Sequence, residues 1–86
     1  MKTVYRYTLP ASPGQFEIAL PAGAQLLSVA EQQYSIVLWA LVDTINHHED
    51  RRFAVAWTGN YVPDNTKAYV GTCTIDALVY HVFELQ

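Results

Sequence analysis

Two adjacent arginines offer the clearest chemistry in this sequence. Arg51 and Arg52 follow a polar stretch that contains His48. A guanidinium binds phosphate through a planar fork of N–H donors, so this pair could hold an anionic ligand. The other interpretation is that the arginines form ion pairs with the neighbouring Glu49 and Asp50. The pattern by itself does not decide between the two.

Aromatic and amide side chains follow within ten residues of the arginines. Tyr61 could stack on a base, and Asn60 could hydrogen-bond a base or ribose edge. Trp57 could stack in the same way, although a core position suits it better, and Tyr61 could equally anchor a loop. The sequence therefore predicts one ligand-binding set, made of His48, Arg51, Arg52, Trp57, Asn60 and Tyr61.

Metal and cofactor binding are not predicted. The run His47-His48-Glu49-Asp50 contains ligand types, but adjacent histidines on an extended chain point to opposite sides. No distant Cys or His pair would complete a structural zinc site. A solvated loop is the expected role of this run.

Catalysis is not predicted either. Ser28, Ser35 and Cys73 could act as nucleophiles, but no local signature such as Gly-x-Ser-x-Gly marks any of them. A lone His81 on an apolar strand is typical of a half-buried residue with a backbone partner. A small nucleotide-processing enzyme that uses His81 as acid or base remains the least favoured alternative.

Charge and composition narrow the classes of partner. The net charge is −3 with only five Lys and Arg residues, so the basic stripe of a nucleic-acid binder is missing. Apolar residues make up 51% of the chain and charged residues 15%, which leaves apolar surface for a partner. We expect a homo-oligomer, with no nucleic acid polymer and no membrane among the partners.

Length, cysteine content and the N-terminal residues bear on the number of domains and on the cellular location. Eighty-six residues make a single domain, residues 1–86. The single Cys73 cannot form an internal disulfide, and Met1-Lys2 leads into an alternating stretch unlike a signal peptide. We expect a cytoplasmic protein.

Hydrophobic alternation predicts short β-strands that would position these residues. The predicted fold is an all-β, small antiparallel sandwich or partly open barrel of about six or seven strands. A helix over Leu26–Tyr34 is the one competing assignment, because apolar residues there fall at helical offsets. The predicted strands are Lys2–Leu9, Gln15–Leu20, Gln25–Glu31, Ile36–Val42, Arg51–Thr58, Lys67–Ile75 and Leu78–Leu85.

The run Ile36–Val42 organises the chain. Its seven residues carry no charge and do not alternate, so the sequence predicts a central strand covered on both faces. Either a closed two-layer sandwich or a second subunit would supply the cover. If the second subunit does so, Trp39 should lie in the contact between copies.

Several short motifs follow one another along the chain. They are Leu20-Pro21-Ala22-Gly23-Ala24, Leu27-Ser28-Val29, Leu38-Trp39-Ala40-Leu41-Val42-Asp43, Arg51-Arg52-Phe53, Thr58-Gly59, Tyr69-Val70-Gly71-Thr72 and His81-Val82-Phe83-Glu84. Together they resemble a family of small, uncharacterised phage and prophage proteins. The resemblance covers nearly the whole chain. The turn at 32–35 departs from it, because the relatives carry Asn-Gly there.

The resemblance implies a phage accessory protein and transfers no mechanism. Many such proteins act against host defence, and some sequester a signalling nucleotide between subunits. We therefore expect an anti-defence, homo-oligomeric binding protein that sequesters a nucleotide-derived immune signal. The alternative is a protein that inhibits a host defence protein by direct contact, or an accessory part of the virion.

Overall fold

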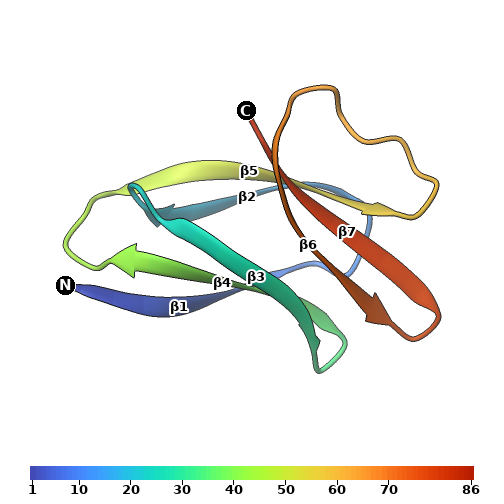
Figure 1. The fold of residues 1–86 in the computed structure, drawn as a ribbon, viewed down its shortest axis with the longest axis horizontal. Helices are drawn as coiled ribbons and strands as arrows, with labels where there is room; N and C mark the ends of the chain where they lie inside the picture. The colour runs from blue at the N-terminus through green and yellow to red at the C-terminus, as the bar shows by residue number, and fades with distance from the viewer.

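Seven antiparallel strands make up the protein in the computed structural model, which describes residues 1–86 (Figure 1). The all-β prediction is confirmed. No helix is long and apolar enough to span a membrane. The strands are β1 (Lys2–Leu9), β2 (Gly14–Pro21), β3 (Gln25–Gln32), β4 (Ser35–Asp43), β5 (His48–Trp57), β6 (Thr66–Ile75) and β7 (Leu78–Leu85).

The strands form two sheets that enclose one core. Sheet A has the order β1-β4-β3, and sheet B has the order β2-β5-β7-β6. The two sheets do not close into a barrel, so the sandwich form of the prediction is the one observed. The buried core gathers Leu9, Leu20, Ala24, Ile36, Leu38, Ala40, Val42, Phe53, Val55, Cys73, Ile75, Tyr80 and Val82.

The competing helix over Leu26–Tyr34 is wrong, because β3 occupies most of this segment. The register with β4 shifts between Leu26 and Ser28, so that Leu27 is an extra, 45% exposed residue. This bulge interrupts the period-2 alternation of the strand. It therefore gives the apolar residues a spacing that imitates a helix.

β4 is the central strand of sheet A, as predicted, but its two faces differ. The residues at 36, 38, 40 and 42 lie in the core. On the outer face Val37 is 2% exposed, whereas Trp39 and Leu41 are only half-buried. Arg6 Nη1 donates to Gln32 Oε1 at 3.0 Å and so links the strands on both sides of β4 near Val37. Within one chain, only the Val37 end of the outer face is covered, and cover of the Trp39 end by a second subunit stays a prediction.

A close contact between β3 and β6 joins the two sheets on one side. The register of β6 shifts between Tyr69 and Gly71, which places a bulge beside this glycine. A Cβ at Gly71 would lie 2.6 Å from Val29 Cγ2. Only glycine therefore lets these two strands approach so closely.

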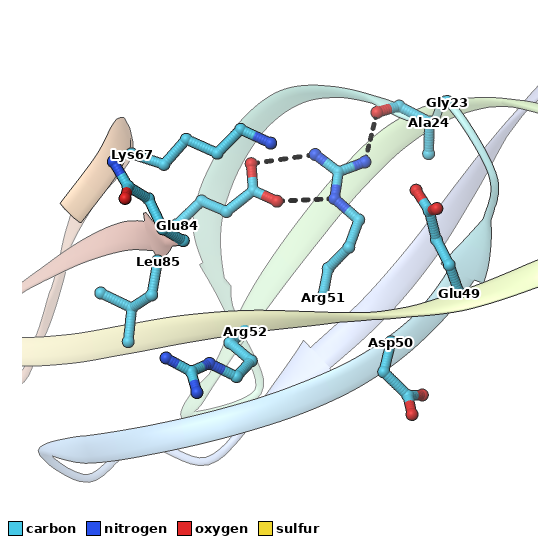
Figure 2. A pocket seen from close by; sticks show the side chains of 10 residues that line it. Gly23, Ala24, Glu49, Asp50, Arg51, Arg52, Lys67, Glu84 and Leu85 are labelled. Carbon is cyan, nitrogen blue, oxygen red and sulfur yellow. Dashed lines mark hydrogen bonds and ion pairs between the residues drawn. The ribbon is translucent and has the colours of Figure 1, made fainter. Parts of the chain in front are cut away.

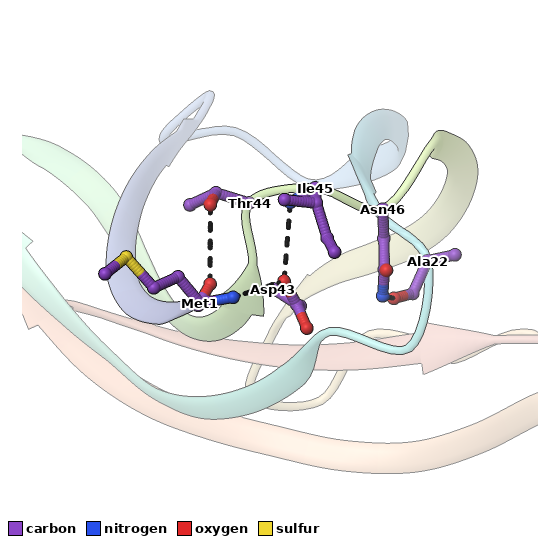
Figure 3. Close-up of polar contacts among 6 residues, drawn as sticks. All are labelled: Met1, Ala22, Asp43, Thr44, Ile45 and Asn46. Carbon is purple, nitrogen blue, oxygen red and sulfur yellow. Dashed lines mark hydrogen bonds and ion pairs between the residues drawn. The ribbon is translucent and has the colours of Figure 1, made fainter.

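Polar contacts hold together one end of the sandwich (Figure 3). Thr44 N donates to Met1 O at 3.0 Å, and Asn46 Nδ2 donates to Ala22 O at 2.9 Å. Asp43 Oδ1 accepts from the Met1 ammonium at 3.0 Å and from Ile45 N at 3.4 Å, and these bonds lower the pKa of the Asp43 carboxyl. The loop between β4 and β5 is thus fixed to the N-terminus and to the β2–β3 turn. β5 begins at His48 rather than at Arg51, so the loop expected over residues 47–50 is wrong from His48 onward, although these residues are exposed.

Candidate functional site

Strand alternation separates the two arginines that the sequence placed together. Arg51 pairs with Ile18 of β2, and Arg52 pairs with Glu17. Their side chains leave β5 on opposite sides, Arg51 toward Glu84 and Arg52 away from it (Figure 2). The two side chains therefore leave opposite faces of sheet B and do not form one fork for a phosphate, although both reach the cleft around Glu84.

Arg51 is a structural residue on the core-facing side of β5. Its Nε and Nη2 donate to the two carboxylate oxygens of Glu84 at 2.6 and 2.9 Å, and Nη1 donates to Ala24 O at 2.5 Å. The hydrogen bonds to Glu84 raise the pKa of Arg51. The ion-pair interpretation of Arg51 is thus the observed one, with Glu84 as its partner in place of Glu49 or Asp50.

An open cleft of about 560 Å³ surrounds this ion pair. Both cationic and anionic side chains line it, and no aromatic ring does, so the cleft suits neither a base nor a polyanion. Figure 2 shows these side chains. The lining residues are Gly23, Ala24, Glu49, Asp50, Arg51, Arg52, Lys67, Glu84, Leu85 and Gln86.

Trp57 and His48 stand at opposite ends of β5. Nine residue steps separate them, which is about 30 Å along an extended strand. Trp57 is 37% exposed and meets the Tyr80 ring edge-on at 6.2 Å, so it lies at the rim rather than inside the core. His48 is exposed. The structure does not bring these two residues into one site.

The connection from β5 to β6 forms a different hollow, which we call the loop pocket. β5 and β6 flank β7 in sheet B, and both run antiparallel to it, so the intervening loop 58–65 must cross the sheet. Figure 1 shows the loop arching away from the end of β5 before it returns to β6. The loop pocket has a volume of about 330 Å³ and is lined by Pro13, Gly14, Gln15, Ala54, Val55, Ala56, Asn60, Tyr61 and Pro63.

Small side chains and free polar groups define the loop pocket. Ala54 and Ala56 face away from the core, yet they are only 2% and 5% exposed. Asn60 Oδ1 accepts from Trp57 N at 2.9 Å, which leaves its Nδ2 free to donate to a ligand. The Tyr61 ring is fully exposed beside this amide. A flat ring could therefore lie on the alanines next to amide donors and acceptors.

A smaller hollow continues from the loop pocket toward Arg52. Gln15, Phe16, Glu17 and Arg52 line about 220 Å³ there, and Gln15 lines both hollows. Arg52 is exposed and forms no ion pair within the chain. The outer face of sheet B thus brings together Arg52, Asn60 and Tyr61 from the predicted set.

Gln15 is a pocket residue that sequence reasoning missed. Its alternation marked it as outward-facing, but only the pairing with Ala54 places it beside the loop. The outward pair Ala54 and Ala56 was a usable signal, because small residues opposite a long loop leave room for a ligand.

A chain of hydrogen bonds surrounds His81 on the same outer face. His81 Nε2 lies 2.7 Å from Thr58 Oγ1, and His81 Nδ1 lies 3.0 Å from Thr72 Oγ1. The Tyr69 hydroxyl lies 2.6 Å from Thr72 Oγ1. His81 is half-buried as predicted, but its side-chain partners are hydroxyls and not backbone groups. Thr58 was not among the residues predicted to be functional.

The nucleophiles considered from the sequence lie elsewhere. Cys73 is 7% exposed, and burial raises the pKa of its thiol, with a further contribution from Glu31. Ser28 lies on β3, and Ser35 begins β4 after the hairpin turn. None of the three forms a hydrogen bond with His81.

These features define a class: a small two-sheet β-sandwich with a ligand-sized hollow under a crossing loop. The chain belongs to the family described as Domain of unknown function (DUF7352), whose profile matches residues 1–86. The expectation of a family without an assigned activity is thereby confirmed. No curated protein and no solved structure matches the chain.

Proposed function

We propose that this chain is a binding protein for a small nucleotide-type ligand, held on the outer face of sheet B. One observation supports the proposal most. The loop 58–65 and the alanines of β5 enclose a hollow of about 330 Å³, which is at the lower end of the range for small-molecule pockets. An exposed aromatic ring and free amide groups line it, as base recognition requires.

Arg52 is the group proposed for the phosphate. It lies on the same face of β5 as Ala54 and Ala56, about 7 and 13 Å along the strand. Because it forms no ion pair, its guanidinium can bind an anion without breaking an internal contact. A ligand with its base at Tyr61 and its phosphate at Arg52 would follow the outer surface of β5.

Calorimetry with nucleoside monophosphates, cyclic dinucleotides and ADP-ribose derivatives tests this proposal. Tyr61→Ala should weaken binding of the responsive ligand about tenfold or more, because stacking on one ring contributes about 1–3 kcal/mol. Arg52→Gln should weaken the binding of phosphorylated ligands and leave the binding of the free nucleoside unchanged. Tyr34→Ala is the matched control, since Tyr34 is 72% exposed on the distant β3–β4 turn. No heat with any ligand, or equal losses in both tyrosine variants, would contradict the proposal.

The biological role proposed for this binding is sequestration. In the setting that the family resemblance implies, a phage-type accessory protein would act against host defence by withdrawing a nucleotide-derived immune signal as a homo-oligomer. Incubation of the protein with the bound signal, followed by denaturation and chromatography, separates storage from processing. Sequestration returns the ligand intact, whereas a converted ligand would favour an enzyme.

A second candidate function is direct inhibition of a host protein, and the outer face of sheet A favours it. Val4 is 51% exposed there, beside the half-buried Trp39 and Leu41. Co-purification from the host cell distinguishes the candidates. A stoichiometric protein partner that is lost in Trp39→Ala would favour inhibition, and a small molecule released from the purified protein would favour sequestration.

A further inference from the structure

The hydroxyl–imidazole chain Thr58–His81–Thr72–Tyr69 has the arrangement of an activated nucleophile. An activated nucleophile has a base within hydrogen-bonding reach and a third group that orients the base. Here Thr58 Oγ1 lies 2.7 Å from His81 Nε2, and Thr72 Oγ1 lies 3.0 Å from the other ring nitrogen. We propose that Thr58 accepts an acyl group from an activated ester. This activity shares Asn60 with the loop pocket but needs no ligand bound there.

The donors and acceptors of this hydrogen-bond chain can be assigned so that His81 accepts the Thr58 proton, as catalysis requires. A neutral imidazole has one donor and one acceptor nitrogen. With the ring proton on Nδ1, His81 donates to Thr72 Oγ1 and accepts the Thr58 proton at Nε2. The Tyr69 hydroxyl, 2.6 Å from Thr72 Oγ1, holds that oxygen in place. Thr72 and Tyr69 are therefore positioning residues, and His81 is the base.

Two free donors lie next to Thr58 in the chain. Gly59 has a φ of +92°, and its backbone N–H donates no hydrogen bond within the protein. The amide Nδ2 of Asn60 is also free, because Asn60 uses only Oδ1 to accept from Trp57 N. Acyl-transfer sites use the N–H of the residue after the nucleophile, with a second donor, to stabilise the oxyanion. Gly59 and Asn60 supply the chemical groups for that role.

The step balances without a cofactor. Thr58 Oγ1 forms a bond to the acyl carbon while its proton passes to His81 Nε2. The carbon–oxygen bond to the leaving group then breaks, and the leaving alkoxide or phenoxide takes up a proton from His81 or remains as the anion. Thr58 is exposed, so an ester can reach it from solvent.

Acetylation by 4-nitrophenyl acetate tests the proposal. We expect release of 4-nitrophenolate with transfer of one acetyl group to Thr58, located by peptide mass spectrometry. Thr58→Ala should abolish this modification, and Thr58→Ser should retain it. His81→Gln should slow it about a hundredfold or more, the usual contribution of a general base. Thr72→Val should alter the pH dependence of the rate, and Thr72→Ser should restore it.

Thr74→Ala is the matched control, because Thr74 is an exposed threonine of β6 without a hydrogen bond to His81. Thr74→Ala should be acetylated at Thr58 at the same rate as the original chain. Acetyl groups found only on lysines or the N-terminus would overturn the proposal. A Thr58 rate unchanged in His81→Gln would overturn it as well. The Thr58→Ser variant keeps the test decisive if Thr58→Ala fails to fold.

Discussion

At the scale of single residues, the two neighbouring arginines show that a shift of one position along a strand changes the surroundings of a side chain completely. Arg51 and Arg52 have the same chemistry and adjacent places in the chain. Arg51 is enclosed by Glu84 and a backbone carbonyl, with 15% of its side chain exposed, whereas Arg52 is exposed and unpaired. A functional proposal can therefore use Arg52, while Arg51 contributes to stability.

Substitution of each arginine by methionine should separate these roles. Arg51→Met leaves the Glu84 carboxylate, 5% exposed, without its partner, and should lower the unfolding free energy by about 3–5 kcal/mol. Arg52→Met should change it by less than about 0.5 kcal/mol. Urea unfolding measures both changes in the unfolding free energy. The double variant Arg51→Met with Glu84→Leu should recover much of the loss, and equal effects of the two single variants would contradict this assignment.

At the scale of elements, the β3–β4 hairpin carries strain at its turn. Gln33 and Tyr34 have φ values of 51° and 62°, which matches a two-residue turn with both central residues in the left-handed region. Asn-Gly is the sequence that such a turn favours, and this chain has neither residue there. The bond from Tyr34 N to Glu31 Oε2, at 2.9 Å, holds the turn.

Replacement of this turn by Asn-Gly should stabilise the protein. Gln33→Asn with Tyr34→Gly relieves the left-handed strain and should raise the unfolding free energy by about 1–2 kcal/mol. For a domain of this size that corresponds to a rise in Tm of about 5 °C or more, measurable by circular dichroism. Gly23→Ala is the opposite control, because its φ of 77° with nothing within 4 Å isolates the backbone penalty. A turn variant that melts at or below the Tm of the original chain would contradict the prediction.

At the scale of the whole molecule, apolar residues exceed what one small core can bury. The outer face of sheet A keeps Trp39 and Leu41 only half-buried, and Val4 is 51% exposed beside them. Contiguous apolar surface of this kind is typical of an interface. We therefore keep the prediction that this face is covered in a homo-oligomer.

Trp39→Ala tests the oligomer directly. If Trp39 lies between copies, the native mass measured by light scattering should fall to that of one chain, and the Tm should fall with it. Ile45→Ala is the matched control, because Ile45 is 82% exposed in the β4–β5 loop. An original chain that is already monomeric would refute the interface. So would a variant that loses stability at unchanged native mass.

The sequence alone determined the strands and which residues alternate between faces. Alternation has a period of two residues and is local, so the outward positions of Arg52, Ala54 and Ala56 could be predicted before the sheet order was known. The turn signals also located the β3–β4 hairpin. The helix-like spacing at Leu27 competed with the correct strand assignment because one bulged residue breaks that local period.

Only the tertiary structure decided which faces meet. The partner of Arg51 lies 33 positions away in Glu84, and His81 meets Thr58 at a separation of 23. Neither contact follows from spacing, because both depend on β7 lying beside β5 in sheet B. Strand order is set by the packing of the whole core, a non-local property. The candidate pocket and the candidate nucleophile therefore became visible only when the sheets were assembled.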